Sequence, residues 1–363
     1  MLLAIKQLFL PPFLLSFLIA FLATPLVIWL YRRLGWLVYP EKEAKKHPAV
    51  VHDKPVPKGG GIPVFLALFF TSLLFLPLDK HLTGILLGAI FAAIIGVLDD
   101  RFDLNPYLRL LTNILCALFV VGAGIGIAFL TNPLGGIIRL DQPQISLFLL
   151  GENRHIWVLS CLFGLAWIGW CMNFIGWSGG VDGQFPGIVA IASFTIAVFS
   201  LRYSADITQW PVIILAAITA GAYLGFLPFN FYPQKIMPGY GGKSLAGYLL
   251  AILAILSTAK VGTLILVLGI PLIDALFLIS KRIIRGKSPV WASREHLHHQ
   301  LLALGWGKRR IAVFYWLVTG FLGFLALNLS SLQKLHALLM LGLIFAAFLL
   351  WLNFFKTKLS PYS

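Results

Sequence analysis

The sequence predicts an all-α integral membrane protein with about 10–11 membrane-spanning helices in a single domain, residues 1–363. Hydrophobic residues make up 59% of the chain and charged residues only 11%. The apolar residues gather in runs that are long enough to cross a bilayer as helices, and short polar loops separate the runs. This composition excludes a soluble globular protein.

Eleven apolar runs are candidate membrane-spanning helices. The run at 244–258 is short and could merge with the next one, which would give ten. The first run is too long for a signal peptide, and two arginines follow it where a cleavage site would lie. The runs fall at about 8–31, 60–77, 82–98, 109–130, 156–173, 186–202, 209–229, 244–258, 260–280, 311–330 and 335–355.

The basic residues predict the orientation. The net charge is +15. If the loop 32–59 is cytoplasmic, every second loop after it and the C-terminus are cytoplasmic too, and these segments hold 21 of the 28 Lys and Arg residues. This positive-inside bias predicts an N-terminus on the outer side. Because topology and membrane lipids account for the charge, nucleic acid is not an expected partner. The three cysteines lie in or beside the runs without metal-type spacing, which indicates buried apolar residues.

An acidic block follows the third apolar run. Of 13 acidic residues in the chain, Asp99, Asp100 and Asp103 lie within five positions. Adjacent carboxylates repel each other by roughly 4 kcal/mol at an effective dielectric constant near 20. A divalent cation, a cationic group or a shared proton would relieve this repulsion. If the helix continued, Asp99 and Asp103 would share one face. Asn105-Pro106 is typical of the start of the next helix, which carries Arg109.

Two glycine-containing loops on the predicted cytoplasmic side contain isolated charged residues. The segment 51–61 ends in Lys-Pro-Val-Pro-Lys-Gly-Gly-Gly, in which Lys54 and Lys58 suit lipid headgroups or a phosphate. The segment 173–183 joins Asn173 to Asp182 through four glycines. Taken alone, this segment is a glycine turn with a turn-forming Asp, although its backbone could approach a ligand closely.

Two later loops suit anions. Pro238-Gly-Tyr-Gly-Gly-Lys-Ser244 lacks the first glycine and the preceding strand of a nucleotide P-loop, but its amides and Lys243 could bind an anion. The loop 281–310 carries Arg282 and then His296-Leu-His-His299, whose imidazoles suit diphosphate binding or proton transfer. Zinc is not expected, since no fourth ligand has suitable spacing. On the opposite side, residues 131–155 predict an external loop or hairpin.

Taken in order, these motifs resemble those of the polyprenyl-phosphate N-acetylhexosamine-1-phosphate transferases, related to the phospho-MurNAc-pentapeptide translocases. The resemblance runs from about Val51 to Arg310. Its short His motif is closer to the GlcNAc-1-phosphate branch than to the muramoyl-pentapeptide branch. The matching pieces are Pro55-Val-Pro-Lys-Gly-Gly, Asp99-Asp100-Arg-Phe-Asp103-Leu, Asn173 through Gly183, and Pro271-Leu-Ile-Asp274 with Ser288-Pro289 and His296-Leu-His-His299.

The resemblance implies an enzyme of the bacterial inner membrane whose active-site loops are cytoplasmic. It would transfer HexNAc-1-phosphate, expected to be GlcNAc-1-phosphate, from a UDP-N-acetylhexosamine to undecaprenyl phosphate. UMP would leave, and a lipid-linked glycan of the cell envelope, such as lipopolysaccharide, would begin. A homodimer is compatible with the sequence.

The resemblance also implies roles for single residues. Asp99 or Asp100 would deprotonate or attack, and Asp182 would position the substrate or a metal. Mg²⁺, with Mn²⁺ as an alternative, would bind Asp100, Asp182 and Asn173. The implied substrate-binding residues are Lys54, Lys58, Asp103, Arg109, Asn173, Lys243, Arg282, His296, His298 and His299.

Four positions depart from the family pattern. Gly176 replaces a usual Asn, and Gly179 replaces the first Asp of Asp-Gly-x-Asp-Gly. Gly241 falls where the family has a metal-binding Asp when the chains are aligned on Ser244-Leu245-Ala246, and Arg109 replaces a usual Lys. The alternative is therefore a non-catalytic relative that binds the lipid carrier or nucleotide sugar as a scaffold or regulator. A transporter is disfavoured because the ionisable residues cluster at one face, with Asp274 the main exception.

Overall fold

The structure, a computed structural model, describes residues 2–41, 54–149, 152–177, 179–257, 260–286, 288 and 295–359. It consists of helices with three short antiparallel strand pairs. The helices are α1 (Leu2–Ala4), η1 (Ile5–Phe9), α2 (Leu10–Arg33), α4 (Gly61–Phe75), α5 (Lys80–Phe102), α6 (Pro106–Gly122), α7 (Val158–Trp177), α8 (Gln184–Leu201), η2 (Ile207–Gln209), α9 (Trp210–Asn230), α10 (Gly239–Leu256), α11 (Lys260–Val267), α12 (Gly269–Ile284), α13 (Leu297–Ala303), α14 (Lys308–Asn328) and α15 (Ser331–Leu359). The strands are β1 (Leu37–Val38), β2 (Val56–Pro57), β3 (Phe129–Thr131), β4 (Ile137–Arg139), β5 (Gln144–Leu149) and β6 (Glu152–Trp157).

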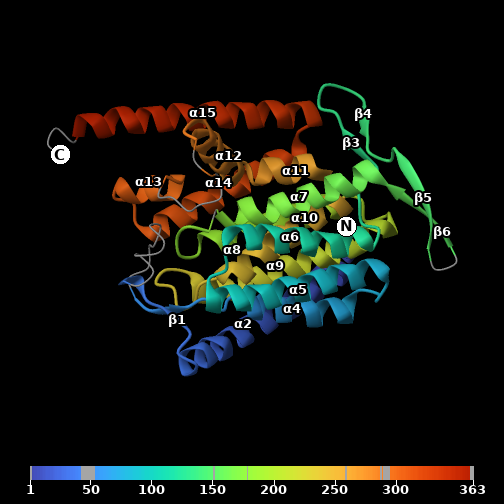
Figure 1. Cartoon of the computed structure of the whole chain (residues 1–363), viewed down its shortest axis with the longest axis horizontal. Helices are drawn as coiled ribbons and strands as arrows, with labels where there is room; N and C mark the ends of the chain where they lie inside the picture. The colour runs from blue at the N-terminus through green and yellow to red at the C-terminus, as the bar shows by residue number, and fades with distance from the viewer. Residues whose placement is uncertain are drawn as a thin grey trace.

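The predicted class of an all-α membrane protein is confirmed. Among the described residues, eight helices are long and apolar enough to cross a membrane, or nine if one bent pair counts as a single span. Two shorter apolar helices, α4 and α6, match two further predicted runs. The predicted run at 244–258 does not merge with the next, because α10 ends at Leu256 and α11 begins at Lys260. Most of the long helices lie side by side in one bundle (Figure 1).

The prediction of one straight helix over 260–280 is wrong. The chain there forms α11 and α12, which meet at an angle of 83° around Leu268. Pro271 explains the break, because it has no N–H to donate to the carbonyl of Val267 and its ring disfavours the straight helix. The bend carries Asp274 to the polar end of the bundle, where it meets the histidine motif.

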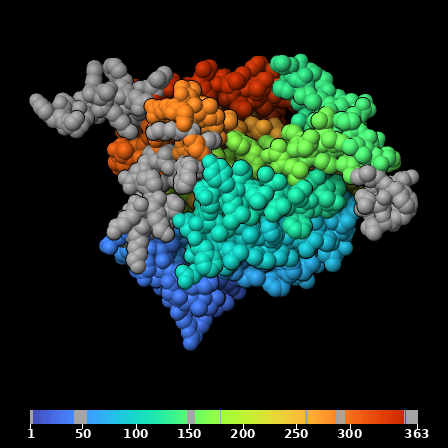
Figure 2. Space-filling model, in the orientation of Figure 1, coloured from blue at the N-terminus to red at the C-terminus, as the bar shows by residue number. Residues whose placement is uncertain are grey.

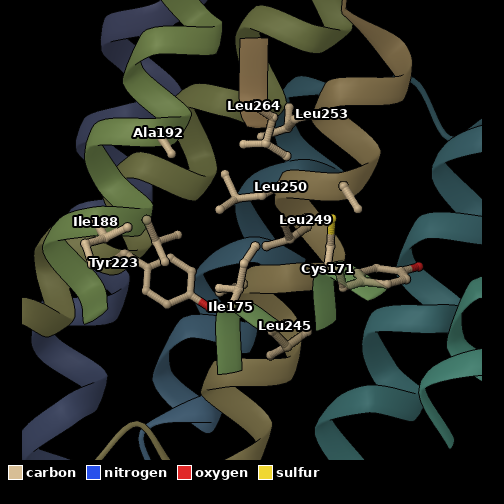
Figure 3. Close-up of a cluster of buried hydrophobic side chains, with 14 of the residues drawn as sticks. Cys171, Ile175, Ile188, Ala192, Tyr223, Leu245, Leu249, Leu250, Leu253 and Leu264 are labelled. Carbon is tan, nitrogen blue, oxygen red and sulfur yellow. The ribbon is translucent and has the colours of Figure 1, made fainter. Parts of the chain in front are cut away.

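Helix α10 forms the centre of the bundle. It packs against α4, α5, α7, α8, α9 and α11. Figure 3 shows its Leu245, Leu249, Leu250 and Leu253 among side chains of the surrounding helices, and all four are fully buried. By contrast, α5 and α6, drawn in teal in Figure 2, form part of the outer surface and expose several leucines there. A helix with this much exposed apolar surface suits contact with lipid.

Close contacts between glycines fix the position of α10. A Cβ added at Gly96 of α5 would lie 2.3 Å from the Cα of Gly241. A Cβ at Gly61 of α4 would lie 2.6 Å from the amide nitrogen of Gly242. Small residues allow helix backbones to approach closely, as is common in membrane bundles. The start of α10 is therefore held between the start of α4 and the end of α5.

The two ends of the bundle differ in character. The hairpins β3–β4 and β5–β6 lie at one end, and β1 and α13 lie at the other (Figure 1). The hairpin interpretation of residues 131–155 is confirmed, and the region holds two hairpins. The loops that carry the sequence motifs gather at the end of β1 and α13, as the contacts in the next section show.

Candidate functional site

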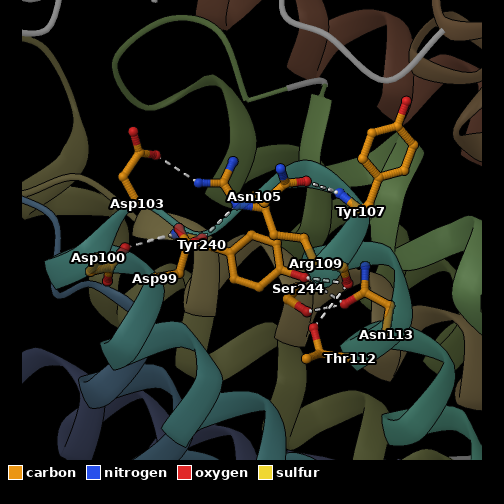
Figure 4. A network of polar contacts seen from close by, with 10 residues as sticks. All are labelled: Asp99, Asp100, Asp103, Asn105, Tyr107, Arg109, Thr112, Asn113, Tyr240 and Ser244. Atoms are coloured by element: carbon orange, nitrogen blue, oxygen red, sulfur yellow. Dashed lines mark hydrogen bonds and ion pairs between the residues drawn. The ribbon is translucent and has the colours of Figure 1, made fainter. Parts of the chain in front are cut away.

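Arg109 connects the two ends of the acidic block. Its Nε donates to Oδ1 of Asp99, which is 4% exposed, and its Nη2 donates to Oδ1 of Asp103 at 2.8 Å (Figure 4). The helix does not continue to residue 103: α5 ends at Phe102, and Asp103 has a φ of 53°. Asn105 then caps α6 through the amide of Tyr107, as predicted. The turn allows one guanidinium to form ion pairs with two carboxylates.

Asp100 points away from Arg109 and meets the start of α10. Its Oδ1 accepts a hydrogen bond from the backbone N–H of Tyr240 at 3.0 Å. Helix N-termini attract negative charge, which favours a carboxylate here. Gly239 must be glycine, because its φ is +65° and a Cβ would lie 2.5 Å from both Asp100 oxygens. Asp99 and Asp100 are thus adjacent in sequence but have separate partners.

Tyr240 links the three helices around this pair. Its hydroxyl donates to Oδ1 of Asn113 at 2.7 Å, and Ser244 donates to the same atom at 3.1 Å (Figure 4). Its ring lies 5.4 Å from the guanidinium carbon of Arg109, within the range of a cation–π contact. Sequence reasoning missed Tyr240 and Asn113. The signal for Tyr240 was a lone aromatic residue within a glycine-rich motif.

The segment 54–61 packs against the residues just before α10. Met237 donates its N–H to the carbonyl of Pro57 at 2.8 Å, and Gly60 donates to the carbonyl of Met237 at 3.0 Å. This pairing brings Lys58 close enough to Asp99 and Asp100 to interact with both electrostatically. The structure therefore places Lys58 near the acidic pair. Lys54 is exposed before β2.

The loop before α8 lies next to Lys243. The ammonium of Lys243 donates to the carbonyl of Gly179 at 3.1 Å. Asp182 is 4% exposed, and its Oδ2 accepts from the N–H of Gln234 at 3.3 Å. Asn230 in turn accepts from the N–H of Gly183 at 3.1 Å. The loop before α8 is therefore joined by direct hydrogen bonds to the segment 230–243.

The histidine motif closes the site. A Cβ added at Gly180 would lie 2.0 Å from Nε2 of His298, so the imidazole packs directly on this glycine. The ring centroids of His298 and His299 are 4.3 Å apart, and those of His296 and His298 are 5.5 Å apart. His298 is 2% exposed, and its burial lowers its pKa well below the usual value, with a further decrease from His299 and His296. His298 is therefore neutral at pH 7.

Asp274 positions the histidine motif. One of its oxygens lies 2.7 Å from Nδ1 of His296, and the other accepts from the N–H of Leu297 at 3.0 Å. Sequence reasoning grouped Asp274 with the histidine motif as one matching piece of the family pattern, but it assigned Asp274 no role. Beside it, the Lys281 ammonium donates to Glu295 at 2.7 Å and lowers the pKa of Glu295. Arg282 also interacts electrostatically with Glu295, so Arg282 lies near the histidine motif.

Asn173 and Gly241 make contacts within or between helices and not with the acidic pair. The amide of Asn173 donates to the carbonyl of Gly169 one turn earlier in α7, at 2.7 Å. A Cβ at Gly241 would lie 3.0 Å from the Cα of Gly96, so a side chain there would enter the contact between α5 and α10. Tyr240, and not Gly241, is the residue of this motif that faces the acidic pair.

The described part of the site offers few carboxylates for a magnesium ion. Across the described ranges, no group of three or more His, Cys, Asp or Glu side chains is arranged to hold a metal ion. Mg²⁺ prefers six oxygen ligands in near-octahedral geometry. Asp100 and Asp182 are the carboxylates that could contribute, while Asn173 is hydrogen-bonded within its own helix. The magnesium prediction is not tested and stays a prediction.

The fold and site define a polytopic membrane protein, with its acidic, basic and imidazole groups gathered at one end of the bundle. Residues 82–258 match the sequence model of glycosyl transferase family 4. Over this region the chain is similar to the glycosyl transferases of that family.

Similar proteins cover most of the chain. A probable undecaprenyl-phosphate N-acetylglucosaminyl 1-phosphate transferase of Bacillus subtilis is 28% identical over 88% of this chain and 84% of its own length. A decaprenyl-phosphate N-acetylglucosaminephosphotransferase of Mycobacterium leprae is 28% identical, covering 84% of this chain and 80% of the relative. A phospho-N-acetylmuramoyl-pentapeptide-transferase of Bacillus velezensis is 27% identical, and the match covers 86% of this chain and 94% of the relative.

Proposed function

We propose that this protein transfers HexNAc-1-phosphate, with GlcNAc-1-phosphate as the expected group, from a UDP-sugar to a polyprenyl phosphate, and that UMP leaves. The observation that carries the proposal is the meeting of the acidic pair, Lys58, Lys243 and the histidine motif at one end of the bundle. The names of the related proteins support the same class of substrates. Phosphoryl transfer needs alignment and charge neutralisation above all, and this set of groups supplies both.

Asp100 is the better candidate for the proton acceptor. Asp99 is paired with the Arg109 guanidinium, whereas Asp100 accepts a backbone hydrogen bond. Asp100 would take the proton of the lipid phosphate. The freed phosphate oxygen would attack the sugar-linked phosphorus of the donor, the bond from that phosphorus to the UMP oxygen would break, and UMP would leave. Asp99 would hold Arg109 in place.

The lysines and imidazoles would bind the donor. Lys58, Arg109 and Lys243 provide positive charge around the position where the diphosphate must lie. His298 lies against Gly180, in the loop that contains Asp182, and His299 lies beside His298. A neutral imidazole can donate one hydrogen bond to a phosphate oxygen. Asp182, held by Gln234, would position the donor or its hydroxyl groups.

An apolar pocket could receive the lipid tail of the acceptor. It has a volume of about 340 Å³ and is lined by Phe91, Leu115, Leu118 and Phe119, between α5 and α6. Phe91 precedes Asp99 by eight residues, which corresponds to about 12 Å along a helix. This spacing would place isoprene units beside the bundle while the phosphate reaches the acidic pair.

We also propose the orientation that the positive-inside bias predicts: a bacterial inner-membrane protein with the site in the cytoplasm and the N-terminus outside. Such an orientation gives the site access to a cytoplasmic nucleotide sugar. A homodimer remains a prediction.

The experiment is to supply purified protein in lipid nanodiscs with undecaprenyl phosphate and UDP-GlcNAc, and to identify the lipid product by mass spectrometry. We expect undecaprenyl diphosphate GlcNAc together with UMP. UDP-GalNAc and the UDP-MurNAc pentapeptide, added in parallel, determine which amino sugar is used. Binding of the nucleotide sugar without any lipid product would favour the alternative of a non-catalytic scaffold or regulator, which the glycine at position 179 supports.

A further inference from the structure

The end of the Lys243 side chain packs directly against Gly179. A Cβ added at Gly179 would lie 2.8 Å from Cε and 3.2 Å from Nζ of Lys243. The same ammonium donates to the carbonyl of Gly179 at 3.1 Å. A side chain at position 179 would therefore displace the lysine. The family resemblance places a carboxylate at this position, and in this chain the end of a lysine side chain takes up that space.

The surroundings of Lys243 contain both signs of charge. Asp99 and Asp100 act on its ammonium from one side, and Lys58 and Arg109 also lie within electrostatic range. Arg109 is already paired with Asp99 and Asp103. Lys58 and Lys243 bring further positive charge beside this cluster, so that the cations offset the acidic groups and their ammonium groups can donate to a bound anion.

Carboxylate ligands for a divalent cation are correspondingly few. Position 179 is glycine, and a side chain at position 241 would enter the helix contact with Gly96. The described part of the chain offers no group of three metal-binding side chains. Charge on the donor must then be neutralised largely by groups that belong to the protein.

We propose that the Lys243 ammonium neutralises the donor diphosphate in the place where a carboxylate-bound divalent cation would otherwise act, so that this protein binds its nucleotide sugar without a divalent metal. The inference rests on the proposed function and deepens it. A fixed ammonium is a compact point charge that can bind phosphate oxygens directly. An ammonium group, unlike a metal ion, needs no carboxylate ligands to hold it, and position 179 is accordingly a glycine.

The first experiment measures binding of UDP-GlcNAc to the purified full-length protein by calorimetry, after removal of metals and in the presence of EDTA. We expect the wild-type Kd to be the same with EDTA and with added Mg²⁺. Lys243→Met should weaken binding about 10- to 100-fold, the value of a lost charged hydrogen bond. Lys235→Met is the matched control: Lys235 is exposed in the preceding loop, and its replacement should leave Kd unchanged.

A second variant tests the exchange of one cation for another. Gly179→Asp combined with Lys243→Ser restores a carboxylate and removes the ammonium. This double variant should bind UDP-GlcNAc in a manner that depends on Mg²⁺. Thermal unfolding of each variant, compared with the wild type, separates loss of binding from loss of folding.

The outcomes distinguish this inference from the proposed function. Sugar-phosphate transfer by the wild type that stops with EDTA, together with loss of UDP-GlcNAc binding, would overturn the role of Lys243 and leave the transferase standing. Metal-independent binding that Lys243→Met abolishes, without any transfer, would support the role of Lys243 and contradict the transferase. Failure of the wild type to bind UDP-GlcNAc under both conditions would overturn both.

Discussion

The adjacent residues Asp99 and Asp100 have different hydrogen-bond partners in the structure. Asp99 is paired with a guanidinium, whereas Asp100 accepts one backbone hydrogen bond. The sequence alone does not distinguish them, since the partner of each depends on where α5 ends and how α10 approaches. The sequence does establish that both lie at a helix end beside several positive charges.

Asp100→Asn should lower the rate of HexNAc-1-phosphate transfer about 10²- to 10⁴-fold, the usual contribution of a general base. The amide retains the shape of the side chain and cannot accept the proton. Initial rates of UMP release measure the effect. Asp206→Asn, at the opposite end of α9 from the site, should leave the rate unchanged. A fully active Asp100→Asn protein would remove Asp100 from the reaction.

Asp274→Asn should raise the KM for the UDP-sugar about tenfold or more, because it weakens the charged hydrogen bond that orients His296. The KM for the lipid phosphate should change little, since the acceptor approaches from α5. A purely structural role would instead lower the melting temperature and affect both substrates equally. Steady-state kinetics with each substrate varied in turn, with melting curves alongside, separates the two roles.

The buried His298 should make the folded protein less stable in mild acid. Its pKa is lowered in the folded state, so below the ordinary value of 6.5 the unfolded chain binds more protons. Stability should therefore fall as the pH falls below 6.5, by at most about 1.4 kcal/mol per pH unit for this group. Chemical unfolding at several pH values between about 7.5 and about 5.0 measures the slope. His298→Gln should unfold with a smaller slope, and equal slopes would contradict the assignment.

At the scale of the element, glycines determine how the helices meet around the site. Gly96 and Gly241 hold α5 against α10, and this contact places Tyr240 beside Asp100. The sequence predicted the helices but not this contact, because a glycine in an apolar run does not reveal which neighbour it faces. The bend between α11 and α12 was missed for a similar reason: Pro271 marks a break, yet a single proline in a long apolar run is often accommodated as a kink.

Gly96→Ala should destabilise the protein by about 1–3 kcal/mol, since the added methyl group would overlap the backbone of α10. Gly320→Ala is the matched control, because Gly320 lies inside α14 and a Cβ there meets no atom within 4 Å. Thermal unfolding in detergent measures both. If the two variants melted at the same temperature, the close contact of α5 with α10 would be wrong.

For the whole molecule, the apolar runs predicted most of the helices. The alternation of loops between the two sides of the membrane predicted which motifs would lie at the same end. Each predicted run contains a helix, but the run 260–280 is divided between α11 and α12, and α6 ends at Gly122, before the end of the run 109–130. The motifs of the predicted cytoplasmic loops meet at one end of the bundle. The site was predictable at the level of loops, since charged and glycine-rich motifs had to lie outside the apolar runs. Its individual pairs, such as Tyr240 with Asp100 or Asp274 with His296, arise from packing between distant segments.

The orientation leads to a labelling prediction. In a chain whose three cysteines are replaced by alanine, Ala205→Cys should react with a membrane-impermeant maleimide in intact cells. Ala303→Cys, exposed in α13 beside the histidine motif, should react only in inside-out vesicles. The reverse pattern would place the site outside the cell and away from a cytoplasmic nucleotide sugar.

The central claim is that groups from five separate loops form one site for direct transfer of a sugar phosphate to a lipid phosphate. The most direct measurement compares the amount of UMP released by the purified protein from UDP-GlcNAc with the amount of polyprenyl phosphate consumed. We expect one UMP for each lipid phosphate, and no UMP without the lipid. UMP that forms at the same rate in the absence of polyprenyl phosphate, or that never forms, would contradict the account.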